Sequence, residues 1–243
     1  KWYGIAYAIG LLAGLTHAKL LCRNTNTLPS KYFDDILIWV AIGTIIGGRL
    51  GYVMFYNFDY YFRNPLLIVL DIRKGGMSFH GGLSGVIMFT YIYSRLYKIS
   101  FLATIDIIAC CAPIGLFLGR IANFINSELW GKPTELPWGI IFPTGGNVSR
   151  HPSQLYEAAL EGILLFIILN IIYFKIYKKS GFTGSIFLIT YGFFRFIIEF
   201  FREPDQQIGF IYGNIITMGM VLSLPMILLG FTLLLIIDVK YRK

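Results

Sequence analysis

The sequence predicts an all-α polytopic membrane protein with about seven transmembrane helices, interfacial arms and a small extracytoplasmic loop region. Hydrophobic residues make up 56% of the chain and charged residues only 14%, which is far more apolar than a soluble domain. Apolar runs of about 20 residues recur, and each is long enough to cross a hydrocarbon core of about 30 Å. We therefore expect no soluble domain of any size, and residues 1–243 are predicted to form a single transmembrane domain.

Seven apolar runs are predicted to span the membrane. They cover residues 2–21, 36–55, 79–97, 102–124, 155–177, 184–201 and 211–239. The last run is longer than a span needs, so its helix could start nearer Asn214. Because the first residue is Lys1 and not Met, we expect a short segment to precede the numbered chain.

Two segments between the spans are predicted to be arms on the outer face of the membrane. Residues 58–78 carry an apolar patch at residues 66–70, which suits a helix lying in the membrane interface. Residues 131–152 are rich in proline and glycine and carry Trp138, a residue type that favours the headgroup level. This second arm is predicted to contain turns or short strands.

The net charge of +8 is distributed as expected for a membrane topology and does not indicate a nucleic-acid partner. With a cytoplasmic C-terminus, seven spans put the N-terminus outside, and basic residues are then in excess on the cytoplasmic side. The cytoplasmic segments would hold Arg23, Lys31, Arg95, Lys98, Lys175, Lys178, Lys179, Lys240, Arg242 and Lys243. The opposite side would hold Arg63, Arg73, Lys74, Lys132, Arg150 and Arg202, besides the terminal Lys1.

Residues 119–131 place polar side chains where a membrane helix should be apolar. If the helix continues through this segment, Arg120, Asn123, Asn126 and Ser127 fall within roughly a third of a turn of one another. A charged side chain at the bilayer centre costs about 2.5–3.5 kcal/mol on insertion scales. The segment is therefore predicted to line a cavity that holds an anion.

A second polar stripe lies in the sixth predicted span. Tyr191, Arg195, Glu199 and Arg202 fall within about 80° of one another on a helical wheel. Arginine stays charged when desolvated and offers a planar fork of donors to phosphate oxygens. Together with Arg120 on another helix, this stripe predicts a pocket for a phospholipid headgroup. The alternative is an internal Arg195–Glu199 pair that only stabilises helix packing.

The third span opens with a glycine-rich segment around His80. An imidazole near its ordinary pKa of about 6.5 can accept a proton at neutral pH, although a capping or interfacial histidine is an alternative. Gly82, Ser84 and Gly85 also fit the Gly-x-Ser-Gly pattern of rhomboid intramembrane proteases.

Residues 150–157 open the fifth span, where His151 is a second candidate for titration. Glu157 and Glu161 lie one turn apart, and we expect them to line the polar interior or pair with a buried arginine. Arg49 is a further candidate for such a pair, or it could snorkel to the interface.

The carboxylates do not predict a metal site or another cofactor. A metal-dependent phosphatidyl transferase would need clustered carboxylates for Mg²⁺. Asp34 and Asp35 are adjacent near a cytoplasmic helix start, and Asp106 stands alone.

Residues 119–131 resemble the signature of the bacterial prolipoprotein diacylglyceryl transferase family, Gly-Arg-x-(Gly/Ala)-Asn-Phe-x-Asn-x-Glu-x-x-Gly, at every fixed position. Four further segments resemble the same family in the right order, so the resemblance covers nearly the whole chain. They are residues 2–4, 80–82, 150–157 and 195–202.

The resemblance implies a transmembrane catalytic domain in the bacterial cytoplasmic (inner) membrane, with its active site facing the outer side. The implied reaction transfers the sn-1,2-diacylglyceryl group of phosphatidylglycerol to the lipobox cysteine thiol of a prolipoprotein and releases sn-glycerol 1-phosphate. This is the first step of lipoprotein maturation. The implied partners are phosphatidylglycerol, the prolipoprotein signal peptide with its lipobox, and membrane lipids, without cofactor or nucleic acid.

Site residues follow from the matching positions. Arg120 would bind the headgroup, and Arg195 would gate or stabilise the leaving phosphate with Tyr191 and Glu199 orienting it. His80 would be the base for the thiol. The implied substrate-binding set is Arg120, Asn123, Asn126, Glu128, Gly131 and Arg202. Asp106 also matches a family position, but it lies about 21 Å along a helix from Arg120, so a structural role is expected.

Two other functions compete with the transferase. One is a rhomboid-like serine protease that uses Ser84 with His80 or His151. The other is a lipid or anion transporter, which would move a headgroup and form no covalent product.

Overall fold

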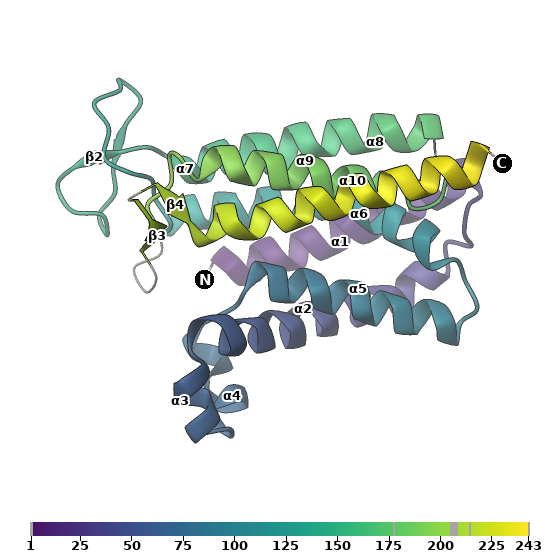
Figure 1. The fold of residues 1–243 in the computed structure, drawn as a ribbon, viewed down its shortest axis with the longest axis horizontal. Coiled ribbons are helices and arrows are strands. Elements are labelled where there is room, and N and C mark those ends of the chain that lie inside the picture. The colour runs from purple at the N-terminus through teal and green to yellow at the C-terminus, as the bar shows by residue number, and fades with distance from the viewer. Residues whose placement is uncertain (1, 177, 205–208, 214, 243) are drawn as a thin grey trace. The chain divides into compact units, whose positions relative to one another are not determined.

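A computed structural model describes residues 2–176, 178–204, 209–213 and 215–242, and most of these residues are helical (Figure 1). The predicted all-α class is therefore confirmed. The chain divides into two compact units, Lys1–Thr27 with Asp106–Lys243, and Leu28–Ile105.

The first unit contains the polar segments around Arg120 and Arg195. Its elements are α1 (Trp2–Thr25), α6 (Phe101–Ile125, from Asp106 onward), β1 (Ile140–Ile141), β2 (Ser149–Arg150), α7 (Ser153–Glu157), the π-helix η2 (Ala158–Leu164), α8 (Leu165–Ile176), α9 (Phe182–Ile198), β3 (Phe210–Tyr212), β4 (Ile216–Thr217) and α10 (Met218–Arg242). Helix α9 packs against both α8 and α10, which run alongside it in Figure 1. Apolar and aromatic side chains such as Leu165, Leu169 and Ile198 are buried in this unit.

Asp106 has the structural role expected for it. Its carboxylate accepts hydrogen bonds from the backbone N–H groups of Gly181 (2.6 Å) and Gly184 (2.7 Å) at the start of α9. These N–H groups have no partner within the helix, and the helix dipole favours a negative charge there. Asp106 thus caps the helix that carries Arg195 at its opposite end.

The second unit is built on two helices in close contact. Its elements are α2 (Tyr32–Tyr56), α3 (Phe58–Arg63), α4 (Leu67–Leu70), the 3-10 helix η1 (Asp71–Lys74) and α5 (Phe79–Leu96). A Cβ atom added to Gly43 would lie 2.7 Å from the Gly85 carbonyl oxygen, so only glycine permits this approach. Small residues spaced four apart commonly allow membrane helices to touch in this way. The contact holds the start of α5, where His80 lies.

For Arg49 the sequence suggests a pair with a buried carboxylate or snorkelling to the interface, and the structure gives its guanidinium other partners. Arg49 lies in the second unit, where its guanidinium donates to the backbone carbonyls of Leu67, Ile68, Gly75 and Gly76 and to the Tyr61 hydroxyl. Several carbonyls at the end of a short helix can satisfy a buried guanidinium as a carboxylate would. Arg49 therefore anchors the arm of residues 58–78 to α2.

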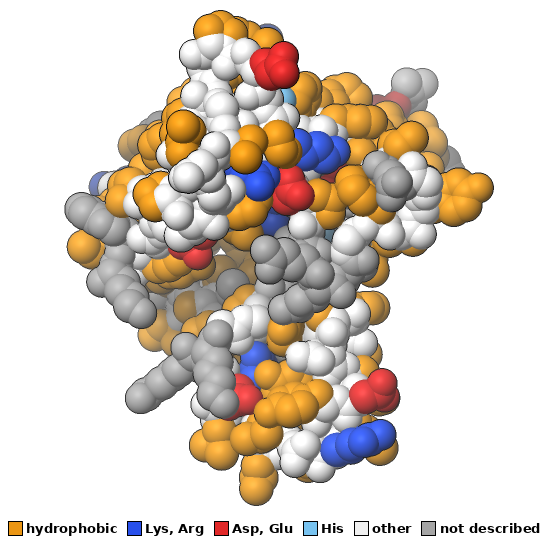
Figure 2. All heavy atoms as spheres, turned by 90° about the vertical axis from the view of Figure 1, so that its left-hand side faces the viewer, with side chains coloured by type: hydrophobic (Ala, Val, Ile, Leu, Met, Phe, Trp, Pro, Cys, Tyr) orange, Lys and Arg blue, Asp and Glu red, His pale blue; other side chains and the backbone are white. Residues whose placement is uncertain are grey.

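Each of the seven predicted spans overlaps a helical segment, but the predicted spans 184–201 and 211–239 extend beyond α9 and α10. Among the described residues, five helical segments are long and apolar enough to cross a membrane, namely Tyr3–Thr25, Tyr32–Tyr56, Phe101–Ile125, Ser153–Ile176 and Met218–Tyr241. Helix α9 is apolar but shorter, and α5 is interrupted by glycine and polar residues. Many large hydrophobic side chains are exposed, among them Leu12 and Leu228. Hydrophobic side chains also cover much of the molecular face that Figure 2 shows. The chain is a multi-pass membrane protein.

The predicted start of the last span at residue 211 is wrong. Strands β3 and β4 form a hairpin before α10, which begins at Met218, and Asn214 lies outside the described residues. A short apolar run can be a strand or part of a helix, and hydrophobic periodicity alone cannot separate the two. Gly213 has a positive φ of 60°, which turns the chain within the hairpin.

The predicted arms contain the expected kinds of element. Residues 58–78 form α3, α4 and η1, with exposed apolar side chains such as Phe62 and Leu66. Residues 131–152 contain the antiparallel pair β1–β2, in which Ile140 lies opposite Arg150.

Candidate functional site

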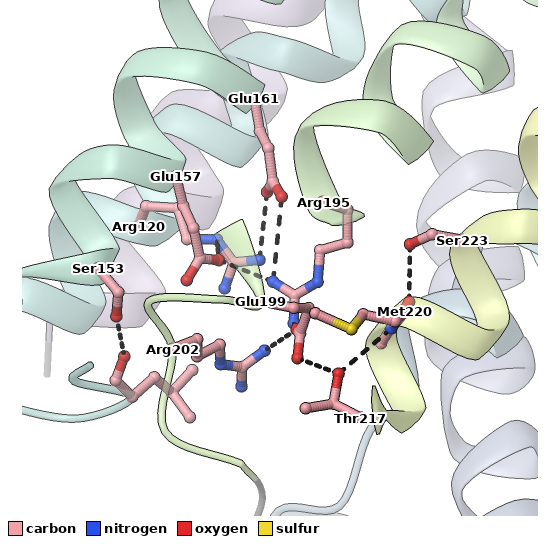
Figure 3. A network of polar contacts seen from close by, with 12 residues as sticks. Arg120, Ser153, Glu157, Glu161, Arg195, Glu199, Arg202, Thr217, Met220 and Ser223 are labelled. Atoms are coloured by element: carbon pink, nitrogen blue, oxygen red, sulfur yellow. Dashed lines mark hydrogen bonds and ion pairs between the residues drawn. The ribbon is translucent and has the colours of Figure 1, made fainter. Parts of the chain in front are cut away.

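Arginine and glutamate side chains from three helical segments of the first unit form one buried network, shown in Figure 3. Arg120 comes from α6, Glu157 ends α7, Glu161 lies in η2, and Arg195 lies near the end of α9. Figure 3 shows the Arg120 and Arg195 side chains pointing toward the same pair of carboxylates.

Glu157 bridges the two arginines with a single oxygen. Its Oε2 lies 2.7 Å from Arg120 Nε and 3.0 Å from Arg195 Nη1. Glu161 makes longer contacts, 3.4 Å from its Oε2 to Arg120 Nη2 and 3.9 Å from its Oε1 to Arg195 Nη1. Both glutamate side chains are fully buried. The expectation that Glu157 and Glu161 pair with a buried arginine is confirmed.

Glu199 links Arg195 to a further arginine. Its Oε1 accepts a hydrogen bond from Arg195 Nη2 and lies 3.6 Å from Arg202 Nη1. The internal Arg195–Glu199 pair therefore exists, but it is only part of the network. Arg195 also reaches two carboxylates on another span, which helix packing within α9 alone does not require.

The network brings three arginines together with three glutamates, so its formal charges balance. Burying such a set costs desolvation energy, and a well-packed apolar core would often be as stable or more stable. In a membrane span, ionisable residues of this kind mark a functional site by default. The fifth span is a π-helix at this place, a form that is frequent at functional sites.

The two central arginines meet the glutamates through different nitrogens. Arg195 uses Nη1 for Glu157 and Nη2 for Glu199. Arg120 uses Nε and Nη2, while its Nη1 makes no hydrogen bond or ion pair within the described part of the chain. The Arg120 side chain is also the more exposed, at 16% against 10% for Arg195. Arg120 can thus donate to an added anion without first releasing a glutamate.

The segment after Arg120 leaves the helix earlier than predicted. Helix α6 ends at Ile125, and Asn126 and Ser127 form a turn, in which Ser127 has a φ of +55°. The single helical face assumed for Arg120, Asn123, Asn126 and Ser127 is therefore wrong beyond Asn123. Ser127 enters the left-handed region, which a continuing α-helix does not allow.

A second polar group lies beside this turn. The Asn123 side chain donates to the Tyr3 hydroxyl of α1, and Tyr3 also interacts with the side chains of Glu128 and Asn126. Gln154 Nε2 donates to the Glu128 backbone carbonyl at 2.8 Å, which ties the turn to the start of the fifth span. Asn123, Asn126 and Glu128 thus all contact the side chain of Tyr3. Gln154 is not among the site residues predicted from the sequence, because its amide acts on a backbone carbonyl of another segment.

Gly131 acts through its backbone in this structure. Its N–H donates to the His151 carbonyl at 2.9 Å, and an added Cβ would lie 2.5 Å from the Phe201 carbonyl oxygen. Glycine is therefore required where this loop crosses the segment after α9, and Gly131 pairs as an isolated bridge with Arg202.

Arg150 and His151 fasten the same loop. The Arg150 guanidinium lies 3.9 Å from the centre of the Trp130 ring and 3.1 Å from Glu203 Oε2. His151 Nδ1 lies 3.2 Å from the Tyr156 hydroxyl. Burial, with a smaller effect of Lys132, lowers the pKa of His151, which keeps the ring neutral at pH 7.

Tyr191 is buried on α9 one turn before Arg195, and its ring stacks on Phe187. It lies in the field of Glu161 and of both central arginines. Helix α9 ends at Ile198, so the helical stripe predicted for Tyr191, Arg195, Glu199 and Arg202 is wrong for Arg202, which lies in the segment after the helix.

His80 and Ser84 belong to the second unit. Ser78 caps α5 by accepting a hydrogen bond from Gly81 N, and His80 follows in the first turn. The Ser84 hydroxyl donates to the His80 backbone carbonyl at 2.9 Å. A serine nucleophile needs its hydroxyl directed to a base, so this geometry does not support the rhomboid alternative.

Comparison with known proteins identifies the family of the chain. The model of a family described as prolipoprotein diacylglyceryl transferase matches residues 1–236. A phosphatidylglycerol–prolipoprotein diacylglyceryl transferase of Allorhizobium ampelinum is 47% identical over 239 residues, which cover 95% of this chain and 83% of the relative. The enzyme of the same name from Agrobacterium fabrum is 49% identical over 238 residues, covering 94% and 85%. Because the family model covers residues 1–236 and these relatives are nearly half identical over most of their length, this chain belongs to the prolipoprotein diacylglyceryl transferase family.

Proposed function

We propose that this protein transfers the sn-1,2-diacylglyceryl group from phosphatidylglycerol to the lipobox cysteine thiol of a prolipoprotein, the first step of lipoprotein maturation. The observation that carries the proposal is the convergence of Arg120 and Arg195, from two different spans, on the same buried carboxylates. The relatives' names supply phosphatidylglycerol and prolipoprotein as substrates.

The reaction forms one bond and breaks one bond at a glycerol carbon. The cysteine sulfur loses its proton to a base and attacks the carbon that carries the phosphate. The C–O bond breaks, its electron pair stays on the phosphate oxygen, and sn-glycerol 1-phosphate leaves. The thioether remains on the peptide. Charge therefore grows on the leaving phosphate, and preorganised cations at that place lower the barrier.

We assign substrate binding to Arg120 and stabilisation of the leaving phosphate to Arg195. Arg120, with Nη1 open, binds the phosphodiester of the incoming headgroup, and Asn123, Asn126 and Glu128 line the glycerol end. Arg195 turns from Glu157 toward the leaving oxygen as its charge increases, because phosphate and carboxylate oxygens accept the same guanidinium fork. Tyr191 and Glu199 hold Arg195 in line.

Arg202 and Gly131 complete the proposed binding site. Arg202 lies on the other side of Glu199 Oε1 from Arg195 and adds a second positive charge there. Gly131 keeps the loop that bears Glu128 against the segment of Arg202.

We further propose that the protein lies in the bacterial inner membrane with its N-terminus outside and its C-terminus in the cytoplasm. The excess of basic residues on one side supports this orientation. Arg120 lies near the end of α6, Glu157 at the start of the fifth span and Arg195 near the end of α9. In the predicted topology these are the outer ends, so the active site faces outward.

The reaction itself is the first test. Purified protein in phosphatidylglycerol vesicles should add one diacylglyceryl group to a lipobox peptide, detected by mass spectrometry, and a peptide with serine in place of the cysteine should stay unmodified. A chelator should leave the rate unchanged. Cleavage of the peptide would indicate a protease. Headgroup flux into sealed vesicles without a covalent product would indicate a transporter.

His80 is proposed as the base that takes the thiol proton. A cysteine thiol has a pKa near 8.5 and is largely protonated at neutral pH. The His80→Gln variant should lower kcat/KM at pH 7 by about 100-fold or more. Raising the pH toward 9 should recover part of the loss, because the thiol then ionises without help.

Ser84→Ala, one turn further along the same helix, is the matched control and should retain activity. Full activity of His80→Gln at pH 7 would show that His80 is not the base that takes the thiol proton. Loss of activity in Ser84→Ala would contradict the proposed transferase mechanism, which does not use this hydroxyl.

A further inference from the structure

Glu199 is held from a second side by the hairpin that precedes α10. Its Oε2 accepts a hydrogen bond of 2.6 Å from the Thr217 hydroxyl at the end of β4, and its Oε1 faces Arg195 and Arg202. Figure 3 shows Thr217 and Glu199 joined between the arginines and the start of α10. All of these side chains are at most about one-tenth exposed.

The hydrogen bonds of Thr217 determine the direction of its proton. The Met220 backbone N–H donates to the Thr217 hydroxyl oxygen at 3.3 Å, as expected at a helix N-terminus. A hydroxyl has one proton and two acceptor lone pairs, and an ionised carboxylate can only accept. The Thr217 proton is therefore given to Glu199 Oε2, and this oxygen acts as an acceptor.

The start of α10 also shapes the space around the carboxylate. Gly219 lies so close that an added Cβ would fall 2.5 Å from Glu199 Cδ. The carboxylate thus lies against the N-terminal turn of α10, where the helix dipole favours a negative charge. Thr217 and this turn fix the position of Glu199 independently of Arg195.

We propose that Thr217 is a positioning residue for the transfer reaction, acting on Arg195 through Glu199. This inference rests on the proposed function. When Arg195 turns toward the leaving phosphate, the anchored Glu199 does not follow the guanidinium. A carboxylate that followed would bring a negative charge to the growing phosphate charge and reduce its stabilisation. Thr217 therefore contributes in the transition state more than in substrate binding.

The test compares two substitutions of one side chain. Thr217→Val removes the hydroxyl at nearly constant shape and should lower kcat about tenfold, as expected for loss of a hydrogen bond to a charged group. KM for phosphatidylglycerol should change less than about twofold, because Arg120 is untouched. Thr217→Ser keeps the hydroxyl and should restore kcat to near the original value.

A control separates this effect from weakening of α10. Ser223 is buried in the same helix, where its hydroxyl donates to the Gly219 carbonyl at 2.7 Å without touching Glu199. Ser223→Ala should lower the unfolding temperature without lowering kcat. An equal loss of kcat in Ser223→Ala and Thr217→Val would overturn the inference.

A double variant tests the route through Glu199. On the residual activity of Glu199→Ala, adding Thr217→Val should change kcat little, because the partner of the hydroxyl is already gone. The same tenfold loss in both backgrounds would show that Thr217 does not act through Glu199. Absence of any diacylglyceryl product from the unsubstituted protein would instead contradict the proposed function.

Discussion

Replacing Arg195 by lysine should lower kcat by about 100- to 1,000-fold while KM for phosphatidylglycerol changes little. Lysine keeps the charge, but its ammonium group cannot reproduce a fork that meets Glu157 through one nitrogen and Glu199 through the other. The interaction that lysine loses is the one with the leaving phosphate in the transition state. The effect should therefore appear in kcat. Steady-state rates with the lipobox peptide at varied phosphatidylglycerol measure both constants.

Two companion variants sharpen this expectation. Arg120→Lys should mainly raise KM, because Arg120 is proposed to bind the substrate headgroup in the ground state. Arg95→Lys changes an exposed arginine on α5 and should have no effect on either constant. A kcat effect of the same size in Arg120→Lys, with KM unchanged, would contradict the division of roles between the two arginines.

Glu157→Gln should destabilise the fold more than any other neutralisation in the network. The Glu157 side chain is fully buried, and one of its oxygens faces both Arg120 and Arg195 within 3.0 Å. Removing its charge leaves two positive guanidinium groups beside each other without the carboxylate that neutralises them. Breaking a buried ion pair typically costs about 3–5 kcal/mol of folding free energy. Thermal unfolding in detergent, followed by circular dichroism, measures the change.

Glu161→Gln is the matched comparison, since it is equally buried but makes contacts of 3.4 and 3.9 Å. It should lower the unfolding temperature less. Phosphatidylglycerol in the micelles should restore more stability to Glu157→Gln than to the unsubstituted protein, because a bound phosphate replaces the missing negative charge. Equal unfolding temperatures for the two variants, with no added effect of the lipid, would contradict the bridging role of Glu157.

Much of the fold follows from local properties of the chain. Apolar runs of about 20 residues predict helices, and each of the seven predicted runs overlaps a helical segment. The exceptions have a common cause. At residues 210–217 an apolar stretch forms a hairpin, and at Asn126 a helix stops inside a polar run. Hydrophobic period does not distinguish these outcomes, because contacts with other segments decide them.

The candidate site shows the same division. A helical wheel places Tyr191, Arg195 and Glu199 on one face, and charge in an apolar span predicts that Arg120 meets something polar inside the protein. Neither argument selects the partner. The wheel predicts the Arg195–Glu199 pair because the two residues are four apart in sequence. It cannot predict the contacts with Glu157 and Thr217, because these residues come from other elements.

From its sequence alone, this chain could be assigned its membrane-spanning character, its family resemblance and its charged residues, because these depend on composition and short spacings. Which charged residues share a partner is seen only in the packing of the first unit. Glu157 bridges Arg120 and Arg195 because α6, the fifth span and α9 bring their side chains together across 37 and 38 residues of chain. Such pairing depends on the distance between helices, which no periodicity within a single helix contains.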